Sequence, residues 1–129
     1  MAMSYVNYNA NPISRRGDDC TVRAISKVLG KSWEVIYMDL CVEGLLKYDV
    51  PSANHVWGAY LRKKGYRREV CAEDCTVADF ASQHAKGRYI LALYSHVVAL
   101  IDGDYYDTWD SGEQLVKYYW QKGTNNVRI

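Results

Sequence analysis

Residues 95–112, "SHVVALIDGDYYDTWDSG", decide the fold that the sequence predicts. A run of β-branched and aliphatic residues follows His96, an Asp102-Gly103 pair interrupts it, and a short aromatic segment carries Asp107. An Asp-Gly pair between two such runs is typical of a two-residue β-hairpin turn of type I′. The stretch therefore predicts an antiparallel hairpin near the C-terminal end of the chain.

This turn determines which side chains of the hairpin share a face. With the turn at Asp-Gly, His96 lies opposite Trp109, and Asp107 lies on the same face, one diagonal step from the imidazole. Diagonal neighbours in a sheet are about 7–8 Å apart along the backbone, within reach of long side chains. We therefore expect Asp107 to orient His96 and Trp109 to shield that contact from water, whereas Asp110 points to the other face and starts a turn.

Helical segments precede the hairpin. Apolar spacing predicts helices over residues 20–29, 33–46, 53–65 and 76–84. Ser32 and Ser52 are the expected N-caps of the second and third helices, and Thr76 opens a capping box with Asp79. Strand-like segments follow at 88–94, 96–101 and 105–109. Helices followed by an antiparallel sheet indicate an α+β fold.

Composition limits the classes of protein that fit. The 129 residues suit a single domain, 1–129, with its own hydrophobic core. The net charge of +1 shows no global electrostatic attraction for nucleic acid or an anionic membrane. No apolar run approaches the ~18 residues of a membrane helix, and the first residues do not resemble a secretory signal. We expect a cytoplasmic protein that does not act at a membrane and is unlikely to bind nucleic acid.

The four cysteines, Cys20, Cys41, Cys71 and Cys75, occupy different contexts. Disulfides are not expected in a reducing compartment. The segment "CAEDC" resembles half of a zinc site, but no second pair of soft ligands follows at suitable spacing, so no metal and no cofactor is predicted. Cys41 lies on the expected apolar face of a helix as a small buried side chain.

Cys20 differs from the other cysteines because it follows a polar loop and stands in the first turn of a helix. The positive end of a helix dipole and its unpaired N–H groups lower the pKa of a thiol and favour the reactive thiolate. Asp18 and Asp19 oppose this effect, and Arg23 supports it. A nucleophilic role is the interpretation that we favour over a structural buried cysteine.

Cys20, His96 and Asp107-Thr108-Trp109, in this order, resemble the papain-like cysteine peptidases. Asp107-Thr108-Trp109 is similar to their Asn-Ser-Trp motif, and "SHVVALIDG" resembles their histidine strand. The cysteine-peptidase domains of bacteriocin-exporting transporters, which use an aspartate in the third role, are similar too, as are small bacterial and phage proteins of this class. The resemblance implies a papain-like fold and a Cys20–His96–Asp107 triad.

One part of the family pattern is missing. Papain-like enzymes carry a glutamine a few residues before the cysteine as an oxyanion-hole donor, whereas no glutamine precedes residue 83 in this chain. Asn11 and Ser14 are the candidate replacements, with Arg15 and Arg16 as further donors. Loss of one such donor typically costs about 10²–10³ in rate.

Two functions follow from these observations. The first is a cysteine hydrolase, a peptidase or isopeptidase that acts through a thioester, with deamidation and acyl transfer as related outcomes. The second is a non-catalytic binding protein of the same fold, to which the missing glutamine points.

His55 and His84 are alternative histidines, expected on a solvated helix face and at a helix C-terminus. The basic cluster at 62–68, "RKKGYRR", is expected to be a solvated face, with an acidic partner or nucleic acid as the alternative.

Overall fold

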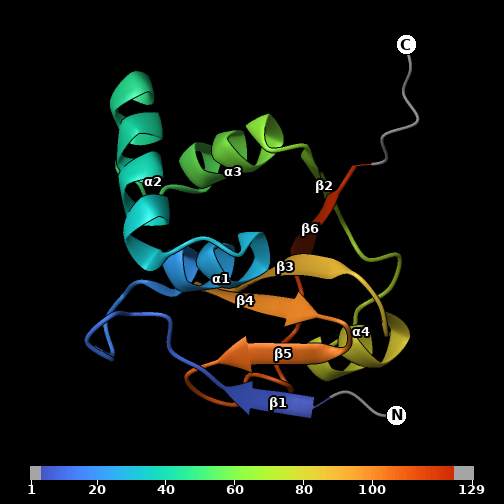
Figure 1. The fold of residues 1–129 in the computed structure, drawn as a ribbon. Coiled ribbons are helices and arrows are strands. Elements are labelled where there is room, and N and C mark those ends of the chain that lie inside the picture. Colours follow the sequence, from blue (N-terminus) through green and yellow to red (C-terminus); the bar gives the residue numbers. More distant parts are fainter. Residues whose placement is uncertain (1–3, 124–129) are drawn as a thin grey trace.

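Four helices and six strands make up residues 4–123, the part of the chain that the computed structural model describes (Figure 1). In chain order the elements are β1 (Ser4–Asn7), α1 (Cys20–Leu29), α2 (Trp33–Lys47), α3 (Asn54–Lys63), β2 (Tyr66–Glu69), α4 (Val77–Gln83), β3 (Arg88–Leu93), β4 (His96–Ile101), β5 (Asp104–Asp107) and β6 (Tyr118–Lys122). The strands form one mixed sheet in the order β1-β5-β4-β3-β6-β2. The predicted α+β class is therefore confirmed.

The predicted hairpin is β4 and β5, and its register is confirmed. Ile101 pairs with Asp104, as the two-residue turn requires. Asp102 and Gly103 have φ angles of 51° and 85°, and positive φ at both central residues is the mark of a type I′ turn. The turn chemistry alone therefore sets the strand pairing that places the carboxyl end of β5 beside the start of β4.

The expectation of a purely antiparallel sheet is wrong at one edge. β1 lies parallel to β5, with Asn7 paired to Asp107. β2 and β6, which the sequence did not predict, pair antiparallel with each other at the opposite edge. These strands have four or five residues each, too few for a clear period-2 pattern, and their pairing joins segments far apart in the sequence.

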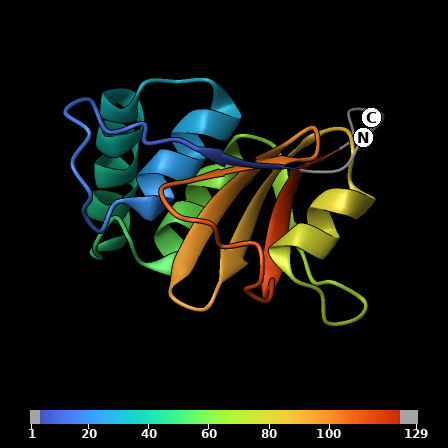
Figure 2. The same cartoon turned by 90° about the horizontal axis from the view of Figure 1, so that it is seen from below.

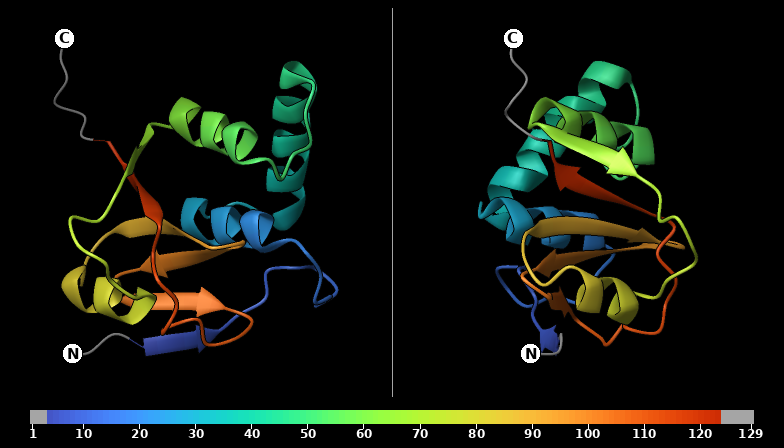
Figure 3. Two further views of the ribbon diagram at one scale, coloured as in Figure 1. Left: turned by 180° about the vertical axis from the view of Figure 1, so that it is seen from behind. Right: turned by 90° about the vertical axis from the view of Figure 1, so that its right-hand side faces the viewer.

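Helices cover both faces of the sheet (Figure 2; Figure 3). On β3, Ile90 and Ala92 belong to the core under α1, α2 and α3, whereas Leu91 and Leu93 belong to the core under α4. Successive side chains of a strand point to opposite faces, so two apolar faces require two layers of helix. This explains why "RYILALY" is apolar without alternation.

The helix boundaries follow their capping residues in most cases. The Ser32 hydroxyl accepts a hydrogen bond from the N–H of Val35, and the capping box of Thr76 and Asp79 is present, so both predicted caps are confirmed. Ser52 is not a cap. The N–H of Ala53 bonds to the Val50 carbonyl in a turn, and the helix therefore starts one residue later, with Ala53 as its N-cap.

α2 is apolar on both of its faces. Ile36 and Leu40 are buried beneath it, while the opposite side carries exposed apolar side chains, among them Leu45, which is 72 % exposed. Of the predicted apolar face, Tyr37 is exposed and Cys41 is only half-buried.

None of the described helices, of which α2 with 15 residues is the longest, combines the length and apolarity needed to cross a membrane.

Candidate active site

His96 and Asp107 form the core of the candidate site. His96 opens β4 and Asp107 closes β5, and the hairpin register brings them to the same end of the two strands. The Nε2 atom of His96 lies 2.7 Å from Oδ2 of Asp107, the distance of a charge-assisted hydrogen bond. The diagonal contact expected from the register is therefore present, and Nδ1 is the ring nitrogen that remains for another partner.

Asp107 is held on several sides and is almost completely buried. Its Oδ2 also accepts a hydrogen bond from the Ser111 hydroxyl at 2.8 Å, and its Oδ1 accepts one from the Thr108 N–H at 2.8 Å. The residue after β1 fixes the backbone at this point, because the N–H of Tyr8 donates to the Asp107 backbone carbonyl at 2.9 Å. A buried carboxylate needs such partners to offset its desolvation, and together they allow little movement of the group.

Trp109 covers one face of the histidine. The two ring centroids are 4.9 Å apart, with the planes inclined by 36°. Trp109 lies beyond the end of β5, so it is not a cross-strand neighbour within the hairpin, yet it contacts His96 as expected. The ring is 41 % exposed, so it shields the histidine while forming part of the protein surface.

Cys20 is the first residue of α1 and lines the same cleft as His96. Burial raises the pKa of this thiol, but hydrogen bonding with His96, the charge of His96, the N–H of Val97 and the charge of Arg23 outweigh it. The net result is a pKa below the ordinary value of a cysteine. A lowered pKa increases the thiolate fraction at neutral pH.

The pKa of His96 moves the opposite way. Burial lowers it, but hydrogen bonds and charge interactions with Asp107 and Cys20 prevail and raise it to about 9. The lowered pKa of the thiol and the raised pKa of the imidazole describe the same event, transfer of the proton from sulfur to nitrogen. The contacts among the three side chains therefore shift the proton from sulfur toward nitrogen.

The aspartates before Cys20 do not cancel this effect. Asp19 is the N-cap residue of α1 but makes no side-chain cap, because its carboxylate pairs with Arg23 and accepts a hydrogen bond from the Trp33 indole at 2.9 Å. Arg23 also approaches Asp107, with 3.9 Å between Nη2 and Oδ1. Arg23 thus links the carboxylates on both sides of the thiol and reduces their effect on it.

A cleft of 810 Å³ opens over Cys20 and His96. Its walls come from the loop before α1, the start of α3 and the β3–β4 turn, and they carry the aromatic side chains of Trp57, Tyr94 and Trp109. The amide of Asn54 and the guanidinium of Arg16 also line it. A cavity of this volume, with aromatic walls and a few polar groups, is typical of a small-ligand or peptide site.

The structure does not bring Asn11 and Ser14 to the thiol. Neither lines the cleft. Asn11 instead organises its own loop, because its Oδ1 accepts from the N–H of Ile13 and its amide donates to Asp19 at 3.2 Å. Ser14 has a φ of 57° and is exposed on that loop. Arg16, the other candidate donor, does line the cleft and donates to the Thr108 carbonyl at 3.5 Å.

Sequence reasoning missed three side chains of the site: Ser111, Asn54 and Arg23 as a contact of Asp107. Arg23 was found only as a charge near the thiol, although its spacing of four residues from Asp19 on a helix predicts their ion pair. Ser111 belongs to the "DSG" turn, and nothing in the sequence shows that the turn folds back onto Asp107. Asn54 begins α3, which only the tertiary packing brings over the cleft.

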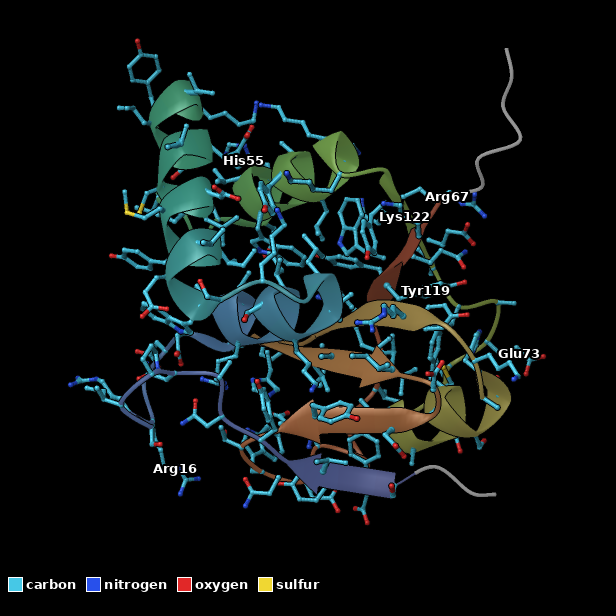
Figure 4. All side chains as sticks on the ribbon, in the orientation of Figure 1. Arg16, His55, Arg67, Glu73, Tyr119 and Lys122 are labelled. Carbon is cyan, nitrogen blue, oxygen red and sulfur yellow. The ribbon has the colours of Figure 1, made fainter. Side chains whose placement is uncertain are left out.

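The alternative histidines lie elsewhere. His55 is bound to Asp49, with 2.6 Å between Nε2 and Oδ2, and Figure 4 places it far from Arg16 at the cleft. The ring of His84 stacks on Phe80, with centroids 3.8 Å apart, and its Nδ1 bonds to the Phe80 carbonyl. Neither lines the cleft, so His96 is the histidine that meets the thiol.

Cys71 and Cys75 form a separate pair, with 3.1 Å between their sulfur atoms. Burial, followed by interaction with Cys71, raises the pKa of Cys75 to about 12, which favours the neutral thiol. Among the described residues, no group of three or more histidine, cysteine or acidic side chains is arranged to hold a metal ion.

Comparison of the chain with protein-family models, curated proteins and solved structures finds no significant match.

Proposed function

We propose that the protein is a cysteine hydrolase with a papain-like arrangement, in which Cys20 is the nucleophile, His96 the acid–base and Asp107 the residue that orients the histidine. The observation that carries the proposal is that Cys20 and His96 line the same cleft while Asp107 binds His96, with 2.7 Å between Nε2 and Oδ2; the lowered pKa of Cys20 and the raised pKa of His96 support it. Structural cysteines in a core have the opposite tendency, since burial alone raises the pKa of a thiol.

The reaction proceeds by acyl transfer. The Cys20 thiolate attacks the carbonyl carbon of an amide and forms a C–S bond, and the C=O electron pair moves to oxygen. The tetrahedral intermediate collapses as the C–N bond breaks, and the His96 imidazolium donates its proton to the departing amine. Water, deprotonated by His96, then attacks the thioester, releases the carboxylic acid and returns the thiolate–imidazolium pair.

The oxyanion requires donors that replace the missing glutamine. The Cys20 N–H lies at a helix N-terminus without a side-chain cap, so it is available to a ligand. Asn54 lines the same cleft, and its Oδ1 accepts from the Trp57 indole at 3.2 Å, which leaves its NH₂ group as the donor. We assign the second oxyanion contact to Asn54 in place of Asn11 and Ser14.

Peptide and isopeptide amides are the substrates that suit the cleft. Trp109, which is 41 % exposed, offers an apolar surface beside His96, and such a wall binds side chains of a peptide without charge selectivity. Deamidation and transfer to an amine use the same thioester and differ only in the leaving group and the acceptor.

A binding protein of the same fold is the second candidate. The observation that favours it is that the loop where papain-like enzymes carry their glutamine donates no side chain from Asn11 or Ser14 to the cleft. In that case the cleft binds a peptide and does not turn it over.

The test is turnover of an activated ester, followed by mass spectrometry of the acylated chain. The wild type is expected to form a thioester on Cys20 and then release the acid, and Cys20→Ala should abolish both steps. Cys41→Ala is the matched control, because Cys41 lies on α2 outside the cleft and should retain full activity. Equal acylation of the wild type and Cys20→Ala would exclude the hydrolase, and acylation without release would favour the binding protein.

A further inference from the structure

A second pocket lies at the other end of α1 from Cys20. It has a volume of 540 Å³ and begins where α1 ends, at Val28 and Gly30. Four segments of the chain contribute one cation each: Lys31, Lys64, Arg88 and Lys122. Lys122 and Arg16, which belong to the two different pockets, are widely separated in Figure 4. The second pocket is thus distinct from the candidate active site.

The charged side chains that line this pocket are all positive. Of the described residues that line it, four are cationic and none is acidic. None of the four forms an ion pair with a described carboxylate, whereas Lys63 pairs with Glu43 and Arg67 pairs with Glu69 close by in the sequence. Since the whole chain carries a net charge of only +1, this concentration of positive charge is local. Like charges that face a common space repel each other, and an anion between them relieves the repulsion.

Two of the cations are held in place by backbone carbonyls. Arg88 Nη1 donates to the Val28 carbonyl at 2.8 Å, and Lys122 Nζ donates to the Lys64 carbonyl at 2.9 Å. The Lys122 ammonium also lies over the Tyr66 ring, 5.3 Å from its centroid. Side chains that are already ordered lose less conformational entropy when a ligand binds.

The floor of the pocket is apolar. Leu29 is partly buried and Tyr66 is 8 % exposed, so each belongs to the core and presents part of its surface to the pocket. Cations above an apolar floor match a ligand with an anionic group at one end and an apolar or aromatic body at the other. Arginine forms paired hydrogen bonds with a phosphate, and lysine adds point charges.

We propose that this pocket binds an organic phosphate whose phosphoryl group lies among Lys31, Lys64, Arg88 and Lys122 and whose apolar body contacts Leu29 and the exposed edge of Tyr66. A carboxylate on a similar body shares this chemistry, and the experiment below separates the two. The proposal does not depend on the hydrolase activity.

The test is a titration of the full chain, followed by calorimetry and by the NMR shift of the Gly30 backbone amide at the edge of the pocket. The probes are adenosine monophosphate, inorganic phosphate, uncharged adenosine and benzoate. Adenosine monophosphate is expected to bind most tightly, to move the Gly30 signal and to weaken as salt is added. Stronger binding of benzoate would show that the site takes carboxylates, and this would overturn the phosphate assignment.

Variants locate the site. Lys31→Glu/Lys64→Glu should weaken adenosine monophosphate binding by about tenfold or more, because two attractive charges become repulsive. Lys86→Glu is the matched control, since Lys86 is exposed and lies outside the pocket, and it should change the affinity by less than about twofold. Circular dichroism checks the fold of each variant. Unchanged affinity in the double variant, equal loss in the control, or no binding of any probe to the wild type would overturn the proposal.

Discussion

At the scale of single residues, the candidate site depends on two pKa values that move toward each other. Cys20, His96 and Asp107 come from three different elements, α1, β4 and β5. Their contacts lower the pKa of the thiol and raise that of the imidazole to about 9. Perturbed pKa values inside a cleft favour a catalytic interpretation, because structural ion pairs are less often placed where a ligand can enter.

The first prediction concerns the reactivity of Cys20. At neutral pH iodoacetamide should modify Cys20 well before Cys75, whose pKa is raised to about 12 by burial and by Cys71. Labelling of Cys20 should rise with pH through its lowered pKa, and His96→Ala should move this rise to higher pH and slow the reaction at neutral pH. Peptide mapping by mass spectrometry measures each site. Equal labelling of the two thiols in the folded chain would contradict the prediction.

The second prediction separates Asp107 from Asp110. Asp107→Ala should lower the rate of Cys20 acylation by about 10²–10⁴ because the imidazole loses its orienting partner. Asp107→Asn should be milder, since an amide oxygen at Oδ2 still accepts from His96 and Ser111, although the NH₂ group at Oδ1 loses the hydrogen bond from the Thr108 N–H.

Asp110→Ala is the control for this pair. The Asp110 carboxylate accepts from the Gly112 N–H, as its predicted role in the turn requires, and from the Tyr105 hydroxyl. Tyr105 shares the sheet face of Asp107, so the expectation that Asp110 points to the other face is wrong. We expect Asp110→Ala to cost less than about 2 kcal/mol in stability and little activity. If Asp110→Ala abolishes acylation while Asp107→Ala preserves it, the assignment of the third residue is wrong.

At the scale of elements, a single glycine in α2 allows the chain that follows the helix to pack closely against it. A Cβ at Gly44 would lie 2.6 Å from the Asp49 carbonyl oxygen and 3.3 Å from the Pro51 nitrogen. Both contacts are with backbone atoms, which cannot relieve the overlap by a change of rotamer. The helix therefore needs a glycine here even though glycine disfavours helix formation.

The third prediction follows from this contact. Gly44→Ala should lower the free energy of unfolding by about 1–3 kcal/mol, because the overlap outweighs the higher helix propensity of alanine. Leu45→Ala, one residue further on, is the matched control. Its side chain is 72 % exposed, so the change should stay within about 0.5 kcal/mol. Urea unfolding measures both, and a Gly44→Ala variant as stable as the wild type would refute the argument.

At the scale of the whole molecule, the candidate site joins the N-terminal helix layer to the C-terminal sheet. α1, which begins at Cys20, packs across β4, which begins at His96, so the two residues line one cleft only when both layers are in place. Folding is therefore coupled to the protonation of His96. The pKa of His96 is raised from 6.5 to about 9, so the folded state holds its proton more tightly than the unfolded chain.

The fourth prediction is a pH dependence of stability. A raised folded-state pKa contributes stability that is fully present below about pH 6.5 and is lost as the pH rises through about 9. The lowered pKa of Cys20 acts in the opposite direction, so the comparison is made between Cys20→Ala and Cys20→Ala/His96→Ala. Asp107 still raises the pKa of His96 in Cys20→Ala, so the difference in free energy of unfolding between the two variants should shrink as the pH rises above about 6.5. A difference that stays constant would show that His96 does not titrate with folding.

The sequence by itself determined the parts of this protein that depend on local chemistry. The Asp102-Gly103 turn set the register of β4 and β5, and that register placed Asp107 beside His96. Periodicity and caps located the four helices to within a few residues, because the signals for a helix lie inside the helix.

Only the tertiary structure decided what depends on contacts between distant segments. The parallel pairing of β1 with β5, the position of Asn54 over the cleft and the turn that carries Ser111 to Asp107 join residues with no shared local pattern. The candidates Asn11 and Ser14 failed for this reason, since their loop bonds to itself and to Asp19 and stays outside the cleft. The four cations of the second pocket likewise come from four separate segments, and only the packing of α1 against the sheet brings their charges together.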